Sequence, residues 1–289
     1  MANWCLKNEW TPDALNRCCK REPPVSVATL NRTATASTQL AWRPPPEMRA
    51  LADGEIHVWR ACLDGLSARS KQFAPTLSPD EVARAERFRF ERDKMRFVAG
   101  RGLLRLILSH YSDIPAGQLV FSYGARGKPR LLSASGEDLL HFNVAHSDRL
   151  ALFAVTRAGE VGIDVECVRP VGESEQIASR FFSERECNQW RSLPARLQTE
   201  AFFNCWTRKE AYLKASGEGI ADSLKQVEVS LIPREPAQLL CLAGDRGAAA
   251  NWRLQALIPA LGYVGALAAR AGSCRFDGLP KRCIPARIG

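Results

Sequence analysis

Two carboxylates stand two residues apart in the segment Gly162-Ile-Asp164-Val-Glu166. The apolar residues that alternate with them predict a β-strand, on which side chains two apart point to the same face. Neighbouring carboxylates repel one another, so a cation between them would stabilise both, and oxygen donors of this kind suit Mg²⁺. The spacing alone leaves open the alternative of a solvated strand edge.

A second pair, Glu210 and Lys214, lies in the segment 206–214, which reads Trp-Thr-Arg-Lys-Glu-Ala-Tyr-Leu-Lys. Residues four apart share one face of a helix, and Trp206 lies one turn earlier on that face. The neighbouring Arg208 and Lys209 make the segment basic around a single acid. The alternative is an ordinary surface ion pair, worth about 0.3–0.5 kcal/mol.

The loop 123–129 reads Tyr-Gly-Ala-Arg-Gly-Lys-Pro and combines glycines with basic side chains. Glycine lets the backbone approach a ligand closely, and arginine and lysine supply contacts to phosphate. The loop lacks the spacing of a P-loop, so a plain turn is the alternative. Its candidate ligand-binding residues are Arg126, Gly127, Lys128 and Pro129.

Two further features are weaker. In the segment 142–148, Phe-Asn-Val-Ala-His-Ser-Asp, His146 follows a predicted strand and lies in a polar cluster with Asn143 and Ser147. A lone histidine is usually structural, but this polar setting is more typical of a ligand site than the average histidine. A row of basic residues precedes it and predicts either a solvated helix face or part of an anion site. Its members are Arg84, Arg87, Arg89, Arg92, Lys94, Arg96, Arg101 and Arg105.

The elements that position these residues follow the same order twice. In the first half, a strand at 55–59 is followed by a helix that a capping box at Ser78 opens, and by a second helix that meets the first near Phe90. Strands are predicted next, at 119–123, 131–132, 141–144, 150–156 and 161–165. In the second half, helices from 183 to about 193 and from 199 to 216 precede strands at 227–231, 239–242, 252–256 and 263–268. Helices before strands indicate an α+β fold of two similar subdomains.

The domain boundaries follow from composition. Residues 1–48 contain polar runs and proline clusters, and we expect a poorly ordered extension. We expect one subdomain over 49–158, a second over 159–271, and a loose tail over 272–289.

The chain has 289 residues, a net charge of +9 and ten cysteines, none in a Cys-x-x-Cys pair. A basic protein favours an anionic partner without naming it. The cysteine spacing argues against a zinc site and fits reduced thiols. No apolar stretch approaches the roughly 20 residues that cross a bilayer, and the start does not resemble a secretion signal, so we expect a cytoplasmic protein.

The order of the motifs resembles a known family. Gly-Lys-Pro at 127–129, Asn-x-x-His-Ser from Asn143, Gly-Ile-Asp-Val-Glu from Gly162, Phe-Ser-x-x-Glu from Phe182 and Trp-x-x-Lys-Glu-Ala-x-x-Lys from Trp206 follow one another as in the surfactin-type 4′-phosphopantetheinyl transferases. The upstream Phe90-x-Arg92-Asp segment is also similar. The resemblance covers about residues 55 to 270.

This resemblance implies two pseudo-twofold-related α/β halves with coenzyme A in the cleft between them. It implies that Asp164, Glu166 and Glu210 bind Mg²⁺, with Glu166 the most replaceable. Glu210, or a metal-bound water that it orients, would accept the proton of a carrier-protein serine, and Lys214 would stabilise or protonate the departing adenosine 3′,5′-bisphosphate. The nucleotide end would meet Arg92, Lys128 and His146. In place of the serine that often precedes this histidine, the chain has Ala145, so one contact to coenzyme A would be missing.

The partners follow from the same resemblance. An acidic carrier protein would be steered by the basic charge, and the Trp-x-x-Lys-Glu-Ala form is more similar to members that serve polyketide or fatty-acid carriers. Two fused halves favour a monomer. The alternatives are a coenzyme A-binding module without catalysis and a nucleic-acid-binding protein. No nucleic-acid motif supports the latter, and we expect neither nucleic acid nor a membrane as a partner.

Overall fold

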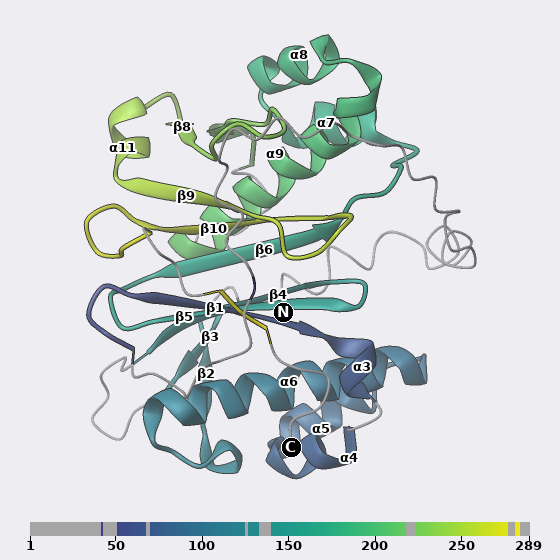
Figure 1. Ribbon diagram of the computed structural model, residues 1–289, viewed down its shortest axis with the longest axis vertical. Helices are drawn as coiled ribbons and strands as arrows, with labels where there is room; N and C mark the ends of the chain where they lie inside the picture. Colours follow the sequence, from purple (N-terminus) through teal and green to yellow (C-terminus); the bar gives the residue numbers. More distant parts are fainter. Residues whose placement is uncertain are drawn as a thin grey trace.

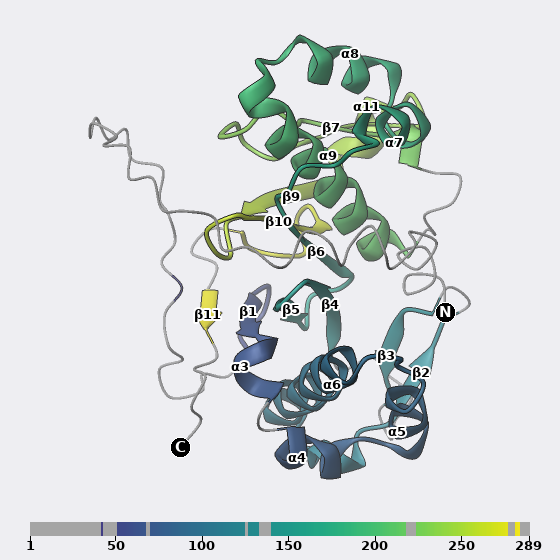
Figure 2. The ribbon, with the colours of Figure 1, turned by 90° about the vertical axis from the view of Figure 1, so that its right-hand side faces the viewer.

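The computed structural model describes residue 42 and residues 51–67, 70–124, 127–132, 140–217, 224–276 and 281–283. Two β-sheets lie face to face, and helices cover the outer side of each sheet (Figure 1). The earlier part of the chain forms one sheet with its helices, joined by the late strand β11 (Lys281–Cys283), and the later part forms the other sheet (Figure 2). The architecture is therefore mixed α and β, in layers of helices, sheet, sheet and helices.

The first half packs a sheet of order β11-β1-β5-β4 against helix α6. Its neighbours are antiparallel except β11 (Lys281–Cys283), which runs parallel to β1. A small hairpin of β2 and β3 lies beside it. The elements are β1 (Ile56–Cys62), α3 (Leu63–Ser67), α4 (Ser70–Phe73), α5 (Pro79–Ala85), α6 (Glu91–Ser112), β2 (Phe121–Tyr123), β3 (Pro129–Leu131), β4 (His141–Ser147) and β5 (Leu150–Thr156), with 3-10 turns at Ala74–Thr76 and Ala116–Gln118.

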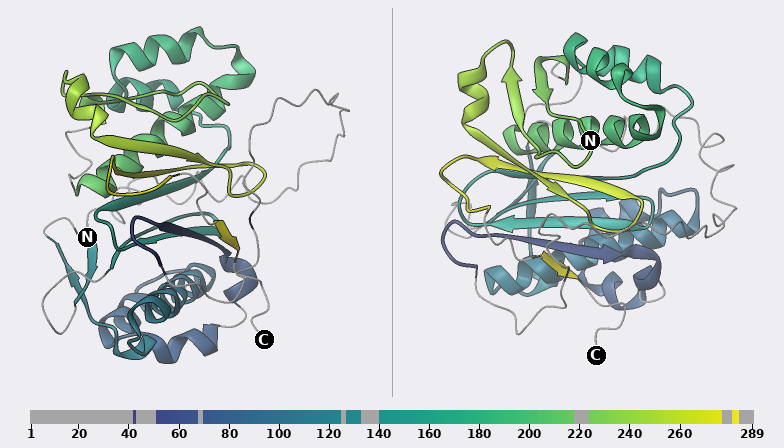
Figure 3. Two further views of the ribbon diagram at one scale, coloured as in Figure 1. Left: turned by 60° about the vertical axis from the view of Figure 1, so that its left-hand side comes forward. Right: turned by 45° about the horizontal axis from the view of Figure 1, so that its top comes forward.

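The second half packs a sheet of order β6-β10-β9 against helix α9. Helix α9 crosses the outer face of this sheet, beneath α7 and α8 (Figure 3). The elements are β6 (Val161–Cys167), α7 (Ser174–Phe181), α8 (Glu184–Ser192), α9 (Ala195–Ser216), a 3-10 turn at Leu224–Gln226, β7 (Val227–Val229), β8 (Leu239–Leu242), α11 (Arg246–Ala250), β9 (Trp252–Leu257) and β10 (Tyr263–Arg270).

The core between the sheets is apolar. Val161, Ile163 and Val165 of β6 are fully buried there and pack in one cluster with residues such as Ile56 and Leu152 of the first sheet. The alternate residues of β6 must therefore point away from the first sheet, toward α9. This alternation leaves Asp164 and Glu166 on the helix side of β6.

Local sequence signals set several element ends. Ser78 and Ser183 form the predicted capping boxes. Phe90 has an extended backbone, with φ −108° and ψ 130°, and separates α5 from α6 as predicted. Helix α9 ends at Gly217, whose φ of 75° favours glycine. Strands β5 and β8 have the predicted bounds.

Other elements differ from the prediction. Helix α7 was not expected, and residues 281–283 of the expected loose tail form β11 against β1. Trp42, inside the expected extension, donates a hydrogen bond from its indole to the Ile258 carbonyl at 3.0 Å and lies under the Arg60 guanidinium. The pairing of β11 and the contact of Trp42 are long-range, so local patterns do not reveal them. No helix in the described ranges has both the length and the apolar character needed to cross a membrane.

Candidate functional site

Gly162 seats strand β6 directly on helix α9. A Cβ at this position would lie 2.0 Å from the Ala211 carbonyl oxygen and 2.4 Å from the Ala215 nitrogen. Such distances are impossible for a real side chain, so only glycine permits this approach. The close contact brings the last turns of α9 over the face of β6 that carries Asp164.

Asp164 and Lys214 form an ion pair across this contact. The Lys214 Nζ lies 2.6 Å from Oδ1 of Asp164 and 3.4 Å from the Ile163 carbonyl oxygen. Asp164 is 1% exposed, whereas the Lys214 side chain keeps 12% of its surface exposed. One member of the carboxylate pair on the strand is therefore in contact with one member of the acid–base pair on the helix.

Glu166, on the second half of the molecule, accepts a hydrogen bond from a side chain of the first half. The Ser147 hydroxyl, at the end of β4, donates to Oε2 of Glu166 at 2.6 Å. The same oxygen of Ser147 accepts the Cys167 backbone N–H at 3.1 Å. Ser147 and Glu166 are both buried, so this hydrogen bond joins the edge strands β4 and β6 at a place that is shielded from bulk water.

Glu210 lies on the same face of α9 as Lys214 and is also buried. One turn earlier, Trp206 packs edge-to-face on Phe181, with ring centroids 5.6 Å apart. Within the described ranges, no three His, Cys, Asp or Glu side chains gather closely enough to hold a metal ion. Asp164, Glu166 and Glu210 nevertheless bring three buried carboxylates to the adjoining elements β6 and α9.

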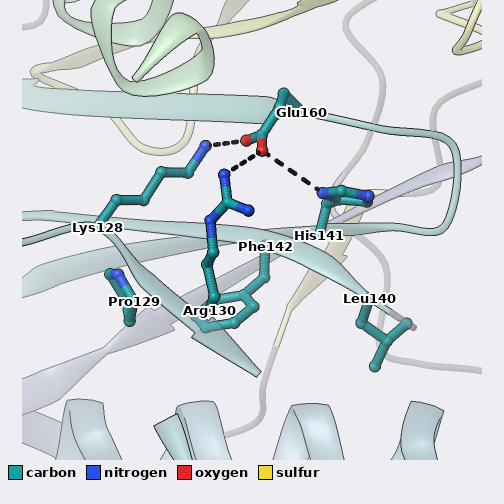
Figure 4. Close-up of a pocket in the computed structure, with 7 residues that line it drawn as sticks. All are labelled: Lys128, Pro129, Arg130, Leu140, His141, Phe142 and Glu160. Carbon is teal, nitrogen blue, oxygen red and sulfur yellow. Dashed lines mark hydrogen bonds and ion pairs between the residues drawn. The ribbon is translucent and has the colours of Figure 1, made fainter. Parts of the chain in front are cut away.

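Lys128 lies in a cluster of basic groups around Glu160 (Figure 4). Its Nζ donates to a Glu160 carboxylate oxygen and to the Val161 carbonyl oxygen at 3.3 Å. Arg130 approaches the other Glu160 oxygen at 3.2 Å, and the His141 ring lies 3.8 Å from it. Burial lowers the pKa of the Lys128 ammonium, and the Glu160 carboxylate opposes that shift.

Gly127 and Pro129, two of the predicted ligand residues, have structural roles in the turn that carries Lys128. Gly127 has φ 77°, and its N–H donates to the Gly124 carbonyl at 2.8 Å. Pro129 begins β3, opposite Tyr123. These residues shape the hairpin that presents Lys128. Arg126 lies outside the described residues.

Asn143 faces β6 and is 7% exposed. Its Oδ1 accepts the Ile163 N–H at 2.9 Å, so it joins the two sheets in the same way as Ser147. His146 is partly buried, and the alternation along β4 places it on the opposite face from Ser147. Ala145 is buried in the core between the sheets.

The predicted row of basic residues divides into different environments. Arg92 is 56% exposed and forms an ion pair with the neighbouring Asp93 at 3.3 Å. Arg105 is buried; it donates to Glu81 at 2.7 Å and to the carbonyls of Ala116 and Leu119. Arg105 therefore stabilises the fold, whereas Arg92 stays accessible to an anion.

The sequence reasoning missed the role of Lys209. Its side chain is fully buried, and its Nζ lies 2.6 Å from Oε2 of Glu186, the last residue of the Phe-Ser-x-x-Glu motif. Lys209 also donates to the Leu224 carbonyl at 2.7 Å, and Glu186 accepts the N–H groups of Ser183 and Val229 at 2.8 Å. Two of the sequence motifs are thus joined by a structural ion pair that fixes α9 against α8 and β7.

The neighbouring residue, Arg208, is also buried and is bound by groups of the fold. Its guanidinium donates to the Ser230 carbonyl at 2.6 Å and to the Ser230 hydroxyl at 2.9 Å. Burial lowers the pKa of Arg208 to about 10. The only sequence signal for either role was the density of basic residues beside Glu210, which does not reveal burial.

Comparison with known proteins identifies relatives of this chain. Residues 160–268 match the model of the 4′-phosphopantetheinyl transferase superfamily, and residues 64–158 match an N-terminal domain of 4′-phosphopantetheinyl transferases. The 4′-phosphopantetheinyl transferase HetI of Nostoc is 44% identical over 230 residues, which cover 80% of this chain and 94% of HetI. The transferase psf-1 of Bacillus pumilus is 37% identical over 58% of this chain and 71% of its own length. Sfp of Bacillus subtilis is 30% identical over 56% of this chain and 70% of its own length.

Proposed function

This chain belongs to the 4′-phosphopantetheinyl transferase superfamily, and from that premise we propose how its own residues transfer the 4′-phosphopantetheine group of coenzyme A to a carrier protein. The acceptor is a serine hydroxyl of the apo carrier, and the released product is adenosine 3′,5′-bisphosphate. The observation that carries the proposal is the ion pair of Asp164 and Lys214, because it joins two chemically distinct motifs in one site.

Asp164, Glu166 and Glu210 are the proposed ligands of Mg²⁺. The donor chemistry fits, because all three are carboxylates, the oxygen donors that Mg²⁺ prefers. All three are buried, with exposed fractions of 1%, 7% and 5%. When bound, Mg²⁺ would neutralise negative charge on the pyrophosphate of coenzyme A.

Glu210 accepts the proton of the attacking serine hydroxyl at a carboxylate oxygen. Lys214 exchanges its contact with Asp164 for the phosphate oxygens and stabilises the charge that develops on the leaving bisphosphate. The 12% exposure of the Lys214 side chain supports this assignment, because a fully buried lysine could not exchange its contact for a ligand. Positioning and electrostatics supply the acceleration, as in other phosphoryl transfers.

The nucleotide end of coenzyme A would bind on the first half. Lys128, His146 and Arg92 are the proposed phosphate contacts, and the exposure of Arg92 is consistent with that role. The remaining members of the predicted set lie nearby in the chain: Arg126, Gly127, Pro129 and Asn143. We propose that the two halves are related by a pseudo-twofold axis and that the substrate lies in the cleft between them, beside β4 and β6.

The net charge of +9 supports an acidic carrier protein as the partner, because opposite charge speeds the encounter of two proteins. We further propose a cytoplasmic monomer that binds neither nucleic acid nor a membrane. A coenzyme A-binding module without catalysis has no support, because the three acids and Lys214 are all present.

The test incubates the protein with coenzyme A, Mg²⁺ and several apo carrier proteins and measures the mass of each carrier. The expected result is a carrier that gains one phosphopantetheine, with no gain after Glu210→Gln. Glu200→Gln, a partly exposed acid on the same helix, is the matched control and should keep full activity. Transfer to none of the carriers would refute the function, and full activity of Glu210→Gln would refute the assigned proton acceptor.

A further inference from the structure

The two sheets are joined at their edge strands by side chains of β4. Strands β4 and β6 belong to different sheets, yet they run side by side (Figure 1). Asn143 accepts the Ile163 N–H, and Ser147, four residues later, accepts the Cys167 N–H four residues later on β6. Two β4 side chains thus substitute for the hydrogen bonds that a neighbouring strand would provide.

Only one of these links reaches a carboxylate of the site. A serine hydroxyl has one proton to donate and two lone pairs to accept with. Ser147 uses one lone pair for the Cys167 N–H and donates its proton to Oε2 of Glu166, at 2.6 Å. That distance is typical of a hydroxyl bonded to an ionised carboxylate, which makes a stronger bond than a neutral acceptor does.

Because both partners are buried, the hydrogen bond between Ser147 and Glu166 limits the conformations that the Glu166 side chain can adopt. Ser147 is 6% exposed and Glu166 is 7% exposed, so water cannot readily replace the hydroxyl. A glutamate has three rotatable bonds, and fixing one oxygen against a rigid strand removes most of that freedom. The backbone N–H of Cys167 fixes the hydroxyl in turn, because it occupies one lone pair and directs the proton toward Glu166.

We propose that Ser147 is a positioning residue that holds the Glu166 carboxylate for the metal ion, so that the first half of the molecule sets one ligand of a site built on the second half. This inference rests on the proposed function for the identity of the site. Ser147 itself touches neither the metal nor the substrate; it acts through Glu166. Partners of this kind outside the ligand shell typically change metal affinity by about tenfold or more when removed.

The test measures Mn²⁺ binding by electron paramagnetic resonance in the absence of coenzyme A, so that it does not depend on activity. Ser147→Ala is expected to weaken Mn²⁺ binding about tenfold, and Ser147→Thr, which keeps the hydroxyl, to stay within about threefold of the wild type. Asn143→Ala is the matched control, because it removes the other link between the sheets without touching a carboxylate. Its Mn²⁺ affinity should remain that of the wild type.

A double-mutant cycle separates positioning from general loosening. If Ser147 acts through Glu166, Ser147→Ala costs no further Mn²⁺ affinity once Glu166→Ala is present. Equal losses in both backgrounds, or wild-type affinity of Ser147→Ala, would overturn the proposal. Ser147→Cys, with a weak donor in a similar volume, replaces Ser147→Ala if that variant does not fold. Absence of Mn²⁺ binding by the wild type would instead refute the metal site, and carrier loading by the wild type tests the transferase function separately.

Discussion

Helix α9 carries two lysine–carboxylate pairs with the same separation of 2.6 Å and different surroundings. In the pair of Lys209 and Glu186, both side chains are buried, and backbone groups of Leu224, Ser183 and Val229 use their remaining hydrogen-bonding capacity. In the pair of Lys214 and Asp164, the lysine keeps 12% of its surface exposed. Distance alone therefore does not separate a structural pair from a functional one.

The two pairs differ in whether the lysine ammonium group can exchange its carboxylate contact for another ligand. Lys209 has no route to solvent, so its contact with Glu186 must persist as long as the fold does. Lys214 is held by one oxygen of Asp164 and, at 3.4 Å, by the Ile163 carbonyl, and its side chain is partly exposed, so an anionic substrate can compete for it. On accessibility and the number of fixed hydrogen bonds we propose a structural role for Lys209 and a functional role for Lys214.

The largest expected effect is on the structural pair. Lys209→Ala leaves Glu186 charged and buried, and breaking a buried pair in this way costs about 3–5 kcal/mol of unfolding free energy. Urea denaturation measures it. A second readout is alkylation of Cys205: burial raises the pKa of this thiol, so it should react slowly at pH 8 in the wild type and faster in the variant.

The control for this variant removes both charges. Lys209→Met combined with Glu186→Gln keeps polar contacts to the backbone without an unpaired charge, and it should recover most of the lost stability. If Lys209→Ala were as stable as the wild type, the structural role of this pair would be refuted.

The functional pair should show the opposite balance. Lys214→Ala is expected to lower the rate of carrier loading about 100-fold, the size of effect seen when one stabilising group for a developing charge is removed. Asp164 is buried as well, but the 12% exposure of Lys214 lets water reach the space that the lysine leaves, so the loss of unfolding free energy should be smaller than that of Lys209→Ala. Steady-state kinetics and urea denaturation on the same preparation compare the two. A variant that loses stability and keeps its rate would reverse the assignment.

The smallest effect concerns a third, more exposed pair, Lys128 and Glu160, whose side chains are 18% and 31% exposed. Glu160→Gln removes a negative charge next to the proposed phosphate contact, so KM for coenzyme A should fall about threefold with kcat unchanged. Glu173→Gln, at the N-terminal end of α7 in the other half, is the matched control and should leave KM unchanged. A rise in KM for Glu160→Gln would mean that Glu160 serves to hold Lys128 in place.

Much of the fold could be predicted from local patterns. Strand β5 has the predicted bounds because its continuous apolar run is bounded by turn residues, and α6 begins where Phe90 was expected to interrupt the helix. Strand β11 could not be predicted, since it depends on the pairing of Val58 with Lys281 from the far end of the chain. Short helices such as α7 carry too few residues for a clear period.

The sequence predicted which residue types form the candidate site, but not which of those side chains contact one another. The spacing of Asp164, Glu210 and Lys214 indicated paired side chains, and the structure brings Asp164 and Lys214 into contact. Ser147 could not be identified, because its partner Glu166 belongs to another sheet. Lys209 was noted only as one of the basic residues around Glu210, since residue spacing does not show which sides of a helix are covered.

Gly162 has a consequence for how variants of this protein should be interpreted. The position carries no charge and donates no ligand, yet any side chain there would lift α9 from β6 and separate Lys214 from Asp164. A change from glycine to alanine, conservative by every measure of polarity and nearly so by size, would therefore resemble the loss of a charged residue in a functional screen. At position 162, the space between β6 and α9 accommodates the hydrogen atom of glycine but not a methyl group, and this steric limit decides which substitutions the protein tolerates.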